Sequence, residues 1–232
     1  MRGPCVSHAM AVLCFKPLHK REGKAVKILV VYYSQYGHVQ AMAKAIGEGV
    51  GEVPGAQLVL RRVREFPENV QHMTQEQGPD YEVYRSEQAD PECTVQDLQE
   101  AEGVLFGSPT RYGNMTAQMK ALIDSTSQLW LDGQMEGKPA GVFTSTATTH
   151  GGQETTLLTM MVPLLHLGML IVGVPYSVPG MNHTEARGGT PYGASTIAGP
   201  KGELKPMAED LAIAKAQGKC VAEVALALRG KK

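Results

Sequence analysis

The sequence predicts an α/β fold: a doubly wound, parallel, five-stranded sheet with helices on both faces. Short runs of apolar and β-branched residues alternate along the chain with segments in which apolar residues recur at helical spacing. These apolar runs are nearly continuous, which is typical of strands buried on both sides. Polar loops containing small residues follow several of them. This alternation predicts crossover helices, which place apolar cover on each side of a sheet.

The first predicted strand covers residues 26–33 and runs into a short turn at 34–39. A helix follows, because apolar residues recur at helical spacing between Val39 and Val50. The Pro54-Gly55 pair ends this region, and alternating apolar residues then predict a second strand over 58–64. The chain therefore begins as half of a β-α-β unit.

The next predicted strand, 103–107, follows a polar stretch. Residues 65–93 lack sustained periodicity, so we predict a long loop or insertion there. A short helix over 95–101 is expected, with Thr94 as its N-cap. A second polar loop, 108–114, leaves the carboxyl end of the third strand.

The second half of the chain repeats the pattern. Asn114 is the predicted cap of an amphipathic helix, and the fourth strand is placed at 139–145. A third polar loop, 146–152, precedes a helix over 153–167. A fifth strand over 169–174 completes the sheet, followed by a glycine-rich segment to Gly202 and a last amphipathic helix.

Length and composition predict one folded domain over residues 26–229, preceded by a disordered extension at 1–25, for which a transit peptide is the less favoured alternative. The net charge of -1, from 22 basic and 23 acidic residues, gives no basic field for nucleic acid. The four cysteines are irregularly spaced, so neither a metal site nor a disulfide framework is expected. No apolar stretch is long enough for an integral membrane segment, and we expect a cytoplasmic protein.

Three loops leave the carboxyl ends of predicted strands, where doubly wound sheets bind ligands: 34–39, 108–114 and 145–152. In the first, the amides of a helix N-terminus, the Ser34 hydroxyl and Gly37 suit an anion. The glycine-rich signatures of triphosphate and dinucleotide sites are absent from the sequence. The loop therefore predicts a phosphomonoester held by neutral donors.

Four motifs in order, SQYGHV, SPTRYGNM, STATTHGGQE and RGGTPYGASTIAG, resemble the flavodoxin-like NAD(P)H:quinone oxidoreductases called tryptophan-repressor-binding proteins. The resemblance covers residues 26–229 and implies a flavodoxin-like, FMN-binding domain. It further implies that NADH or NADPH donates two electrons, as hydride, which pass to a quinone. Alternate use of one pocket by nicotinamide and quinone predicts ping-pong kinetics.

Three groups of FMN contacts are carried over by motif. The first surrounds the phosphate, the second lines the flavin ring, and the third closes over the other edge of the ring and the ribityl chain. These residues are Ser34, Gln35, Tyr36, Gly37, His38 and Val39; Thr110, Arg111 and Tyr112; and Ser145, Thr146, Ala147, Thr148, Thr149, His150 and Gly151.

Further residues are assigned to the substrate and to a neighbouring subunit. The resemblance implies that Tyr36 flanks the nicotinamide path, that Trp130 forms an apolar wall for the quinone, and that His166 reaches the flavin of a neighbour in a homotetramer. Taken alone, Trp130 is most simply a core or interface residue and His166 a buried histidine, whereas the place of Arg111 in its loop favours function over a surface ion pair.

Two functions of other classes remain open at this level. A flavodoxin-type electron carrier would need a charged docking face, which the near-neutral composition does not favour. A repressor accessory protein, as the family name suggests, finds no support in charge or motifs.

Overall fold

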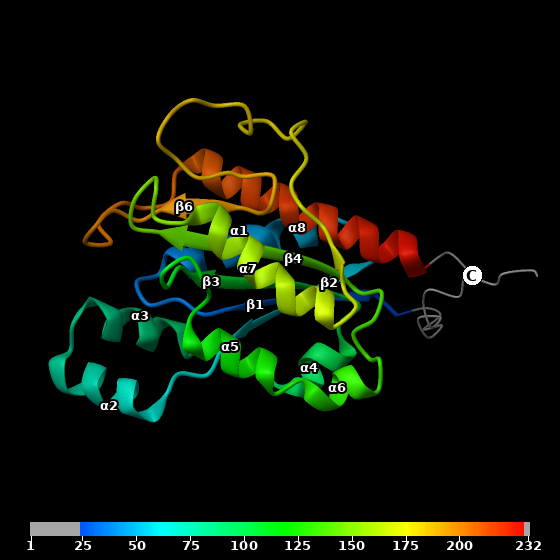
Figure 1. The fold of residues 1–232 in the computed structure, drawn as a ribbon, viewed down its shortest axis with the longest axis horizontal. Helices are drawn as coiled ribbons and strands as arrows, with labels where there is room; N and C mark the ends of the chain where they lie inside the picture. The colour runs from blue at the N-terminus through cyan, green and yellow to red at the C-terminus, as the bar shows by residue number, and fades with distance from the viewer. Residues whose placement is uncertain (1–23, 230–232) are drawn as a thin grey trace, which may run out of the picture.

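The computed structural model describes residues 24–229, so residues 1–23 of the predicted extension lie outside the described residues. Five parallel strands form the main path of a six-stranded sheet, in the order β2-β1-β3-β4-β5 (Figure 1). Their bounds are β1 (Val26–Tyr32), β2 (Ala56–Arg62), β3 (Gly103–Pro109), β4 (Pro139–Thr146) and β5 (Leu170–Ile171). The strand order reverses at β1, because the chain adds β2 on one side and β3 on the other.

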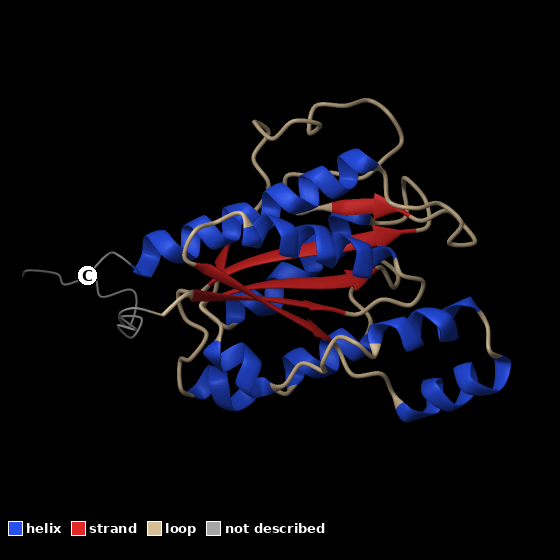
Figure 2. Ribbon diagram, turned by 180° about the vertical axis from the view of Figure 1, so that it is seen from behind, coloured by secondary structure: helices blue, strands red, loops and turns tan. Residues whose placement is uncertain are grey.

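Helices cover both faces of the sheet, as predicted (Figure 2). One face packs against α1 (His38–Gly51) and α8 (Ala208–Arg229). The other packs against α4 (Val95–Glu100), α5 (Ala117–Asp124), α6 (Ser127–Leu131) and α7 (Gln153–His166). Successive residues of β1 enter these two cores in turn, which explains its continuous apolar run. Within residues 24–229, no helix is both long and apolar enough to span a membrane.

A further short strand, β6 (Ser195–Ile197), pairs with the end of β4 and was not predicted. It also explains why β5 is shorter than the predicted 169–174. The Val172 amide still bonds to Ala140 of β4, but the Val174 amide bonds to Pro191 instead. The chain leaves β4 there, and β6 takes the remaining length of the same edge.

The prediction of a loop over 65–93 was wrong, because this segment contains α2 (Pro67–Glu76) and α3 (Pro79–Glu87). Each helix begins with proline and has acidic residues in its first turn, two features that favour helix starts. Only one residue is buried in each, so neither has an apolar face to reveal it. The two helices form an arm beside the sheet (Figure 1), here called the α2–α3 arm.

Asn114 does not cap the next helix. Its backbone closes a turn with Arg111, and its side chain accepts the Met115 amide. Thr116 caps α5 instead, by accepting a hydrogen bond from the Met119 amide. The 108–114 loop is therefore two residues longer than predicted before the helix begins.

Helices α1 and α8 cross at glycines. A Cβ atom at Gly49 would lie 1.8 Å from the Lys215 carbonyl oxygen, and one at Gly218 would lie 2.1 Å from the Ile46 carbonyl oxygen. The two backbones approach so closely that no side chain fits between them. The last helix thereby supports the first, whose N-terminus faces the crevice described below.

We expect Gly49→Ala to lower the free energy of unfolding by about 1–3 kcal/mol, because the added methyl must push α8 away. Gly51→Ala is the control, since a Cβ there meets nothing within 4 Å. Urea denaturation at one protein concentration measures the free energy of unfolding of both variants. Equal midpoints for the two variants would contradict the close crossing.

Candidate functional site

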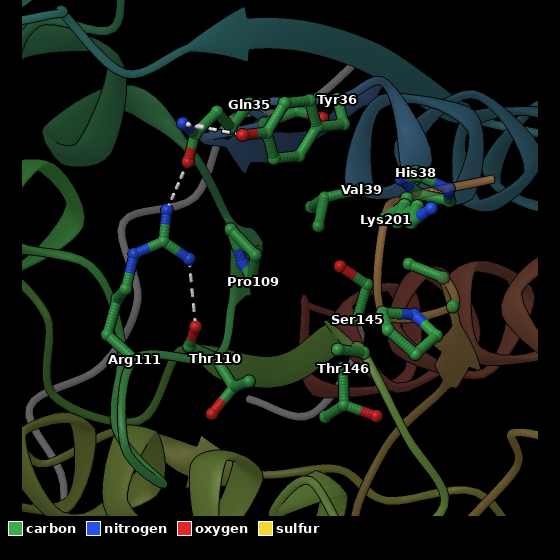
Figure 3. Close-up of a pocket in the computed structure, with 16 residues that line it drawn as sticks. Gln35, Tyr36, His38, Val39, Pro109, Thr110, Arg111, Ser145, Thr146 and Lys201 are labelled. Carbon is green, nitrogen blue, oxygen red and sulfur yellow. Dashed lines mark hydrogen bonds between the residues drawn. The ribbon is translucent and has the colours of Figure 1, made fainter. Parts of the chain in front are cut away.

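A cavity of about 230 Å³ lies at the carboxyl ends of the central strands, where the strand order reverses. It is lined by the three predicted loops and by a fourth segment, 198–202 (Figure 3). The sequence-predicted residues that meet there are Ser34, Gln35, Tyr36, His38, Val39, Thr110, Arg111, Ser145, Thr146 and Ala147.

The turn after β1 presents hydrogen-bond donors to this cavity. Gly37 is the N-cap of α1, with a φ of 86° that favours glycine, and no side chain caps the helix. The Gly37 amide donates to Ser34 Oγ over 3.0 Å, which leaves the Ser34 hydroxyl proton free to donate elsewhere. The first-turn amides of α1 therefore remain available to an anion, together with a buried hydroxyl.

Arg111 joins the first two loops across the cavity. Its guanidinium donates to the Thr110 carbonyl over 2.9 Å and to the Gln35 side-chain oxygen (Figure 3). Gln35 in turn donates to the Tyr36 hydroxyl over 3.3 Å. The guanidinium is thus held by neutral oxygens of the site, not by the surface ion pair considered above. It places one fixed positive charge beside the cavity.

The third loop packs against the second. The Thr110 amide donates to the Ser145 carbonyl over 2.9 Å, and both Ser145 and Thr146 are buried. Thr146 Oγ1 donates to the Thr148 carbonyl, and the Gly151 amide closes the turn on that same carbonyl. Only Ser145, Thr146 and Ala147 line the cavity.

Several predicted residues lie elsewhere. Thr149 and His150 line a separate cavity of about 380 Å³ on the other side of their loop. Tyr112 has a φ of 54° and a fully exposed side chain, so it projects into solvent from the second loop. Thr148 and Gly151 close the turn described above, and Gly37 is the N-cap of α1 but does not line the cavity.

Trp130 and His166 line a groove of about 610 Å³ between α5–α6 and α7, away from the cavity. Both side chains are exposed, Trp130 by 56%, so neither belongs to the core. Val162, also exposed, lines the same groove. This apolar, unpartnered surface fits the interface reading of Trp130 and not the buried reading of His166.

Sequence reasoning missed the fourth wall, formed by Ala198, Gly199, Pro200, Lys201 and Gly202. The motif RGGTPYGASTIAG ends at Gly199 and so contains the first two residues of this wall, and two of the five wall residues are glycines. The glycines of this segment were the available signal for a ligand-binding loop. Nothing in the sequence, however, indicates that residues 198–202 lie beside the turn after β1. Pro109 was also missed, although it lies inside the second motif.

The α2–α3 arm supports the first turn from behind with buried polar groups. Glu65, at the base of the arm, accepts hydrogen bonds from the Tyr33 hydroxyl over 2.6 Å and from Gln118 over 2.7 Å. Burial and this hydrogen bond raise the pKa of Tyr33. Tyr84 and Glu87 of α3 border a small pocket shared with this network and with Gln35.

Glu87 is the exception in this network, because its Oε1 atom is buried without a hydrogen-bond partner among the described residues. Burial raises the pKa of Glu87 to about 8. This pKa already includes the smaller effects of nearby charges: Arg62 and Lys44 lower it, and Asp90 and Glu65 raise it. Glu87 therefore stays protonated in the folded protein at neutral pH.

Comparison with known proteins identifies similar chains. A family model described as NADPH-dependent FMN reductase matches residues 26–183. A protein from Geotalea daltonii named NAD(P)H dehydrogenase (quinone) is 52% identical over 204 residues, which cover 88% of this chain and 98% of that protein. One of the same name from Geobacter sulfurreducens is 50% identical over 206 residues, which cover 88% of this chain and all of that protein.

A solved structure of a flavodoxin, WrbA-like protein from Agrobacterium tumefaciens aligns with a TM-score of 0.59 at 21% identity. The alignment covers 88% of this chain and 99% of that chain. At this identity the likeness concerns the fold, and it agrees with the flavodoxin-like sheet that was predicted.

The raised pKa of Glu87 predicts a pH-dependent stability. In the unfolded chain this carboxyl ionises near 4.5, but in the folded protein near 8, so stability falls as pH rises between these values. Glu87→Gln removes this loss. We expect the difference in free energy of unfolding between Glu87→Gln and the original chain to shift in favour of the variant by more than about 1.4 kcal/mol from pH 5 to pH 8.

Denaturation measured across this pH range tests the effect. Glu82→Gln, an exposed position on the same helix, is the matched control. Parallel stability curves for Glu87→Gln and the original chain would show that Glu87 is already ionised when folded.

Proposed function

The chain belongs to the NADPH-dependent FMN reductase family, and on this premise we propose that it is an FMN-dependent NAD(P)H:quinone oxidoreductase that reduces quinones to hydroquinones. The observation that carries the proposal is the cavity at the reversal of strand order. It combines an uncapped helix N-terminus with a fixed guanidinium. The two relatives described above, half identical over nearly their whole length, support the same activity.

The donor set of the cavity fits FMN. A phosphomonoester requires donors and tolerates no nearby carboxylate, and none of the described lining residues is acidic. The open amides at the start of α1 and the Ser34 hydroxyl suit the phosphate. Residues 34–39 would therefore hold the phosphate, and Thr110 and Arg111 the ring, with Tyr112 at its exposed edge. Ser145, Thr146 and Ala147 would enclose the ribityl chain and the remaining edge. Thr148 and Gly151 would keep the turn of that loop closed, and Thr149 and His150, which line the separate cavity, would not contact the flavin of their own subunit.

FMN, when bound, supplies two-electron chemistry between a nicotinamide and a quinone. The protein supplies position and charge. Arg111 favours the negative charge that two-electron reduction brings, because its guanidinium is already fixed by Gln35 and the Thr110 carbonyl. Tyr36, half exposed at the rim, borders the path of the nicotinamide. In this proposal nicotinamide and quinone use the same cavity in turn.

We also propose a homotetramer in which Trp130 and His166 complete a neighbour's site. In one subunit they lie on an exposed apolar groove away from the cavity, so they can act on a flavin only across an interface. Trp130 would then offer the flat apolar surface that a quinone stacks upon. A cytoplasmic location is proposed as well, because the electron donor is a coenzyme of the cell interior.

The activity is tested with the purified full-length chain. We expect a yellow protein that NADH or NADPH bleaches and benzoquinone reoxidises, with parallel double-reciprocal lines when both substrates are varied. Intersecting lines and a demonstrated ternary complex would refute the ping-pong order. A protein that takes up no FMN would refute the function itself.

The assembly is tested by placing a charge in the groove with Val162→Glu. Val162 is 53% exposed, so the subunit should still fold and bind FMN, while the tetramer dissociates and quinone reduction falls. Gln75→Glu adds the same charge to exposed α2 and serves as control. Analytical ultracentrifugation gives the readout; an unchanged tetramer would exclude this face as the interface.

A further inference from the structure

The segment from Ala198 to Leu204, here called the 198–204 loop, forms a strap across one end of the cavity. It is attached to the third loop, because the Ala198 amide donates to the Thr146 carbonyl over 2.7 Å. It is also closed on itself, since the Leu204 amide donates to the Ala198 carbonyl over 2.8 Å. Between these bonds, Gly199 and Gly202 both take positive φ angles, which turn the chain tightly.

His38 fastens this loop to the start of α1. Its ring Nε2 lies 2.7 Å from the Leu204 carbonyl oxygen, and because a carbonyl only accepts, Nε2 must be the donor. The ring is 7% exposed, so water competes little for this bond. Gly202 packs beside His38 and Tyr36, because a Cβ atom added to this glycine would lie 3.7 Å from the nearest atom of each. The loop is therefore held at the helix N-terminus that offers the open amides.

Lys201 lies at the tip of the turn and lines the cavity beside His38 and Val39 (Figure 3). Its ammonium group forms no hydrogen bond or ion pair with another described residue. The adjacent acid, Glu203, is engaged with the loop backbone, where its Oε2 accepts the Lys201 amide over 2.8 Å. Among the described residues, Lys201 and Arg111 are the two lysine or arginine side chains that line the cavity, and Arg111 is bound to Gln35.

We propose that Lys201 neutralises the phosphate of FMN and thereby makes the site selective for FMN over riboflavin. This rests on the proposed function and deepens it. A phosphomonoester carries between one and two negative charges at neutral pH, whereas the amides of α1 and the Ser34 hydroxyl are neutral. A lysine on a flexible stem acts as a point charge toward phosphate. His38 is a positioning residue, because it holds the loop that carries Lys201.

Flavin titration of the full-length, flavin-stripped protein tests the proposal through fluorescence quenching, independently of turnover. We expect Lys201→Gln to raise the dissociation constant for FMN about fivefold and to leave that for riboflavin unchanged. Lys201→Arg should restore most of the FMN affinity. The matched control is Lys205→Gln, because Lys205 is exposed, directly follows the 198–204 loop and does not line the cavity.

Salt dependence gives a second measurement. FMN affinity of the original chain should fall as ionic strength rises, and Lys201→Gln should flatten that dependence, because the screened charge is gone. The role of His38 is tested in a double-mutant cycle. His38→Ala should weaken FMN binding in the original chain but much less in the K201Q background, since it acts through the loop.

Two outcomes would overturn the inference while leaving the proposed function intact: an unchanged FMN affinity in Lys201→Gln, or an equal loss for FMN and riboflavin. The second outcome would show that Lys201 contacts the flavin ring, or only stabilises the 198–204 loop, and does not act on the phosphate. A protein that binds neither flavin would refute the proposed function, and the inference with it.

Discussion

Strand β1 is hydrogen-bonded to β2 on one side and to β3 on the other, and its side chains enter both hydrophobic cores. Nothing about this strand can shift without disturbing the whole sheet. Its carboxyl end therefore delivers the turn of residues 34–37 to a fixed position, and α1 begins there with its first amides uncapped. The neighbouring ends of β3 and β4 bring two more loops to the same edge. The candidate site is a consequence of this arrangement.

Much of this was predictable because the central strands are buried on both faces, so their apolar runs stand out. The loops that follow them were correctly brought together at one edge, including Ser34, Thr110 and Ser145. Failures came where local sequence carries little information. The α2–α3 arm has almost no buried apolar residue, and β6 is three residues that pair with β4 only after a long excursion.

Side-chain direction was the least predictable property of the site. Tyr112 and Thr110 are two residues apart, yet Tyr112 is fully exposed and Thr110 lines the cavity, because Tyr112 itself takes a left-handed backbone conformation. His38 was expected at the phosphate, but its ring bonds to a carbonyl more than 160 residues later in the chain. No spacing rule relates such partners, since their proximity depends on the completed fold.

The glycine crossing of α1 and α8 has a consequence for the order of folding. The helix that presents the open amides is supported by the last helix of the chain, and their contact joins the two ends of the domain. A contact of such high sequence separation forms only after most of the loop-closure entropy has been lost. During synthesis, the N-terminal half emerges from the ribosome first, and α1 can pack on β1 and β2 but lacks its α8 partner until the residues of α8 follow. Full support of the turn of residues 34–37 is thus a late event, because it requires α8.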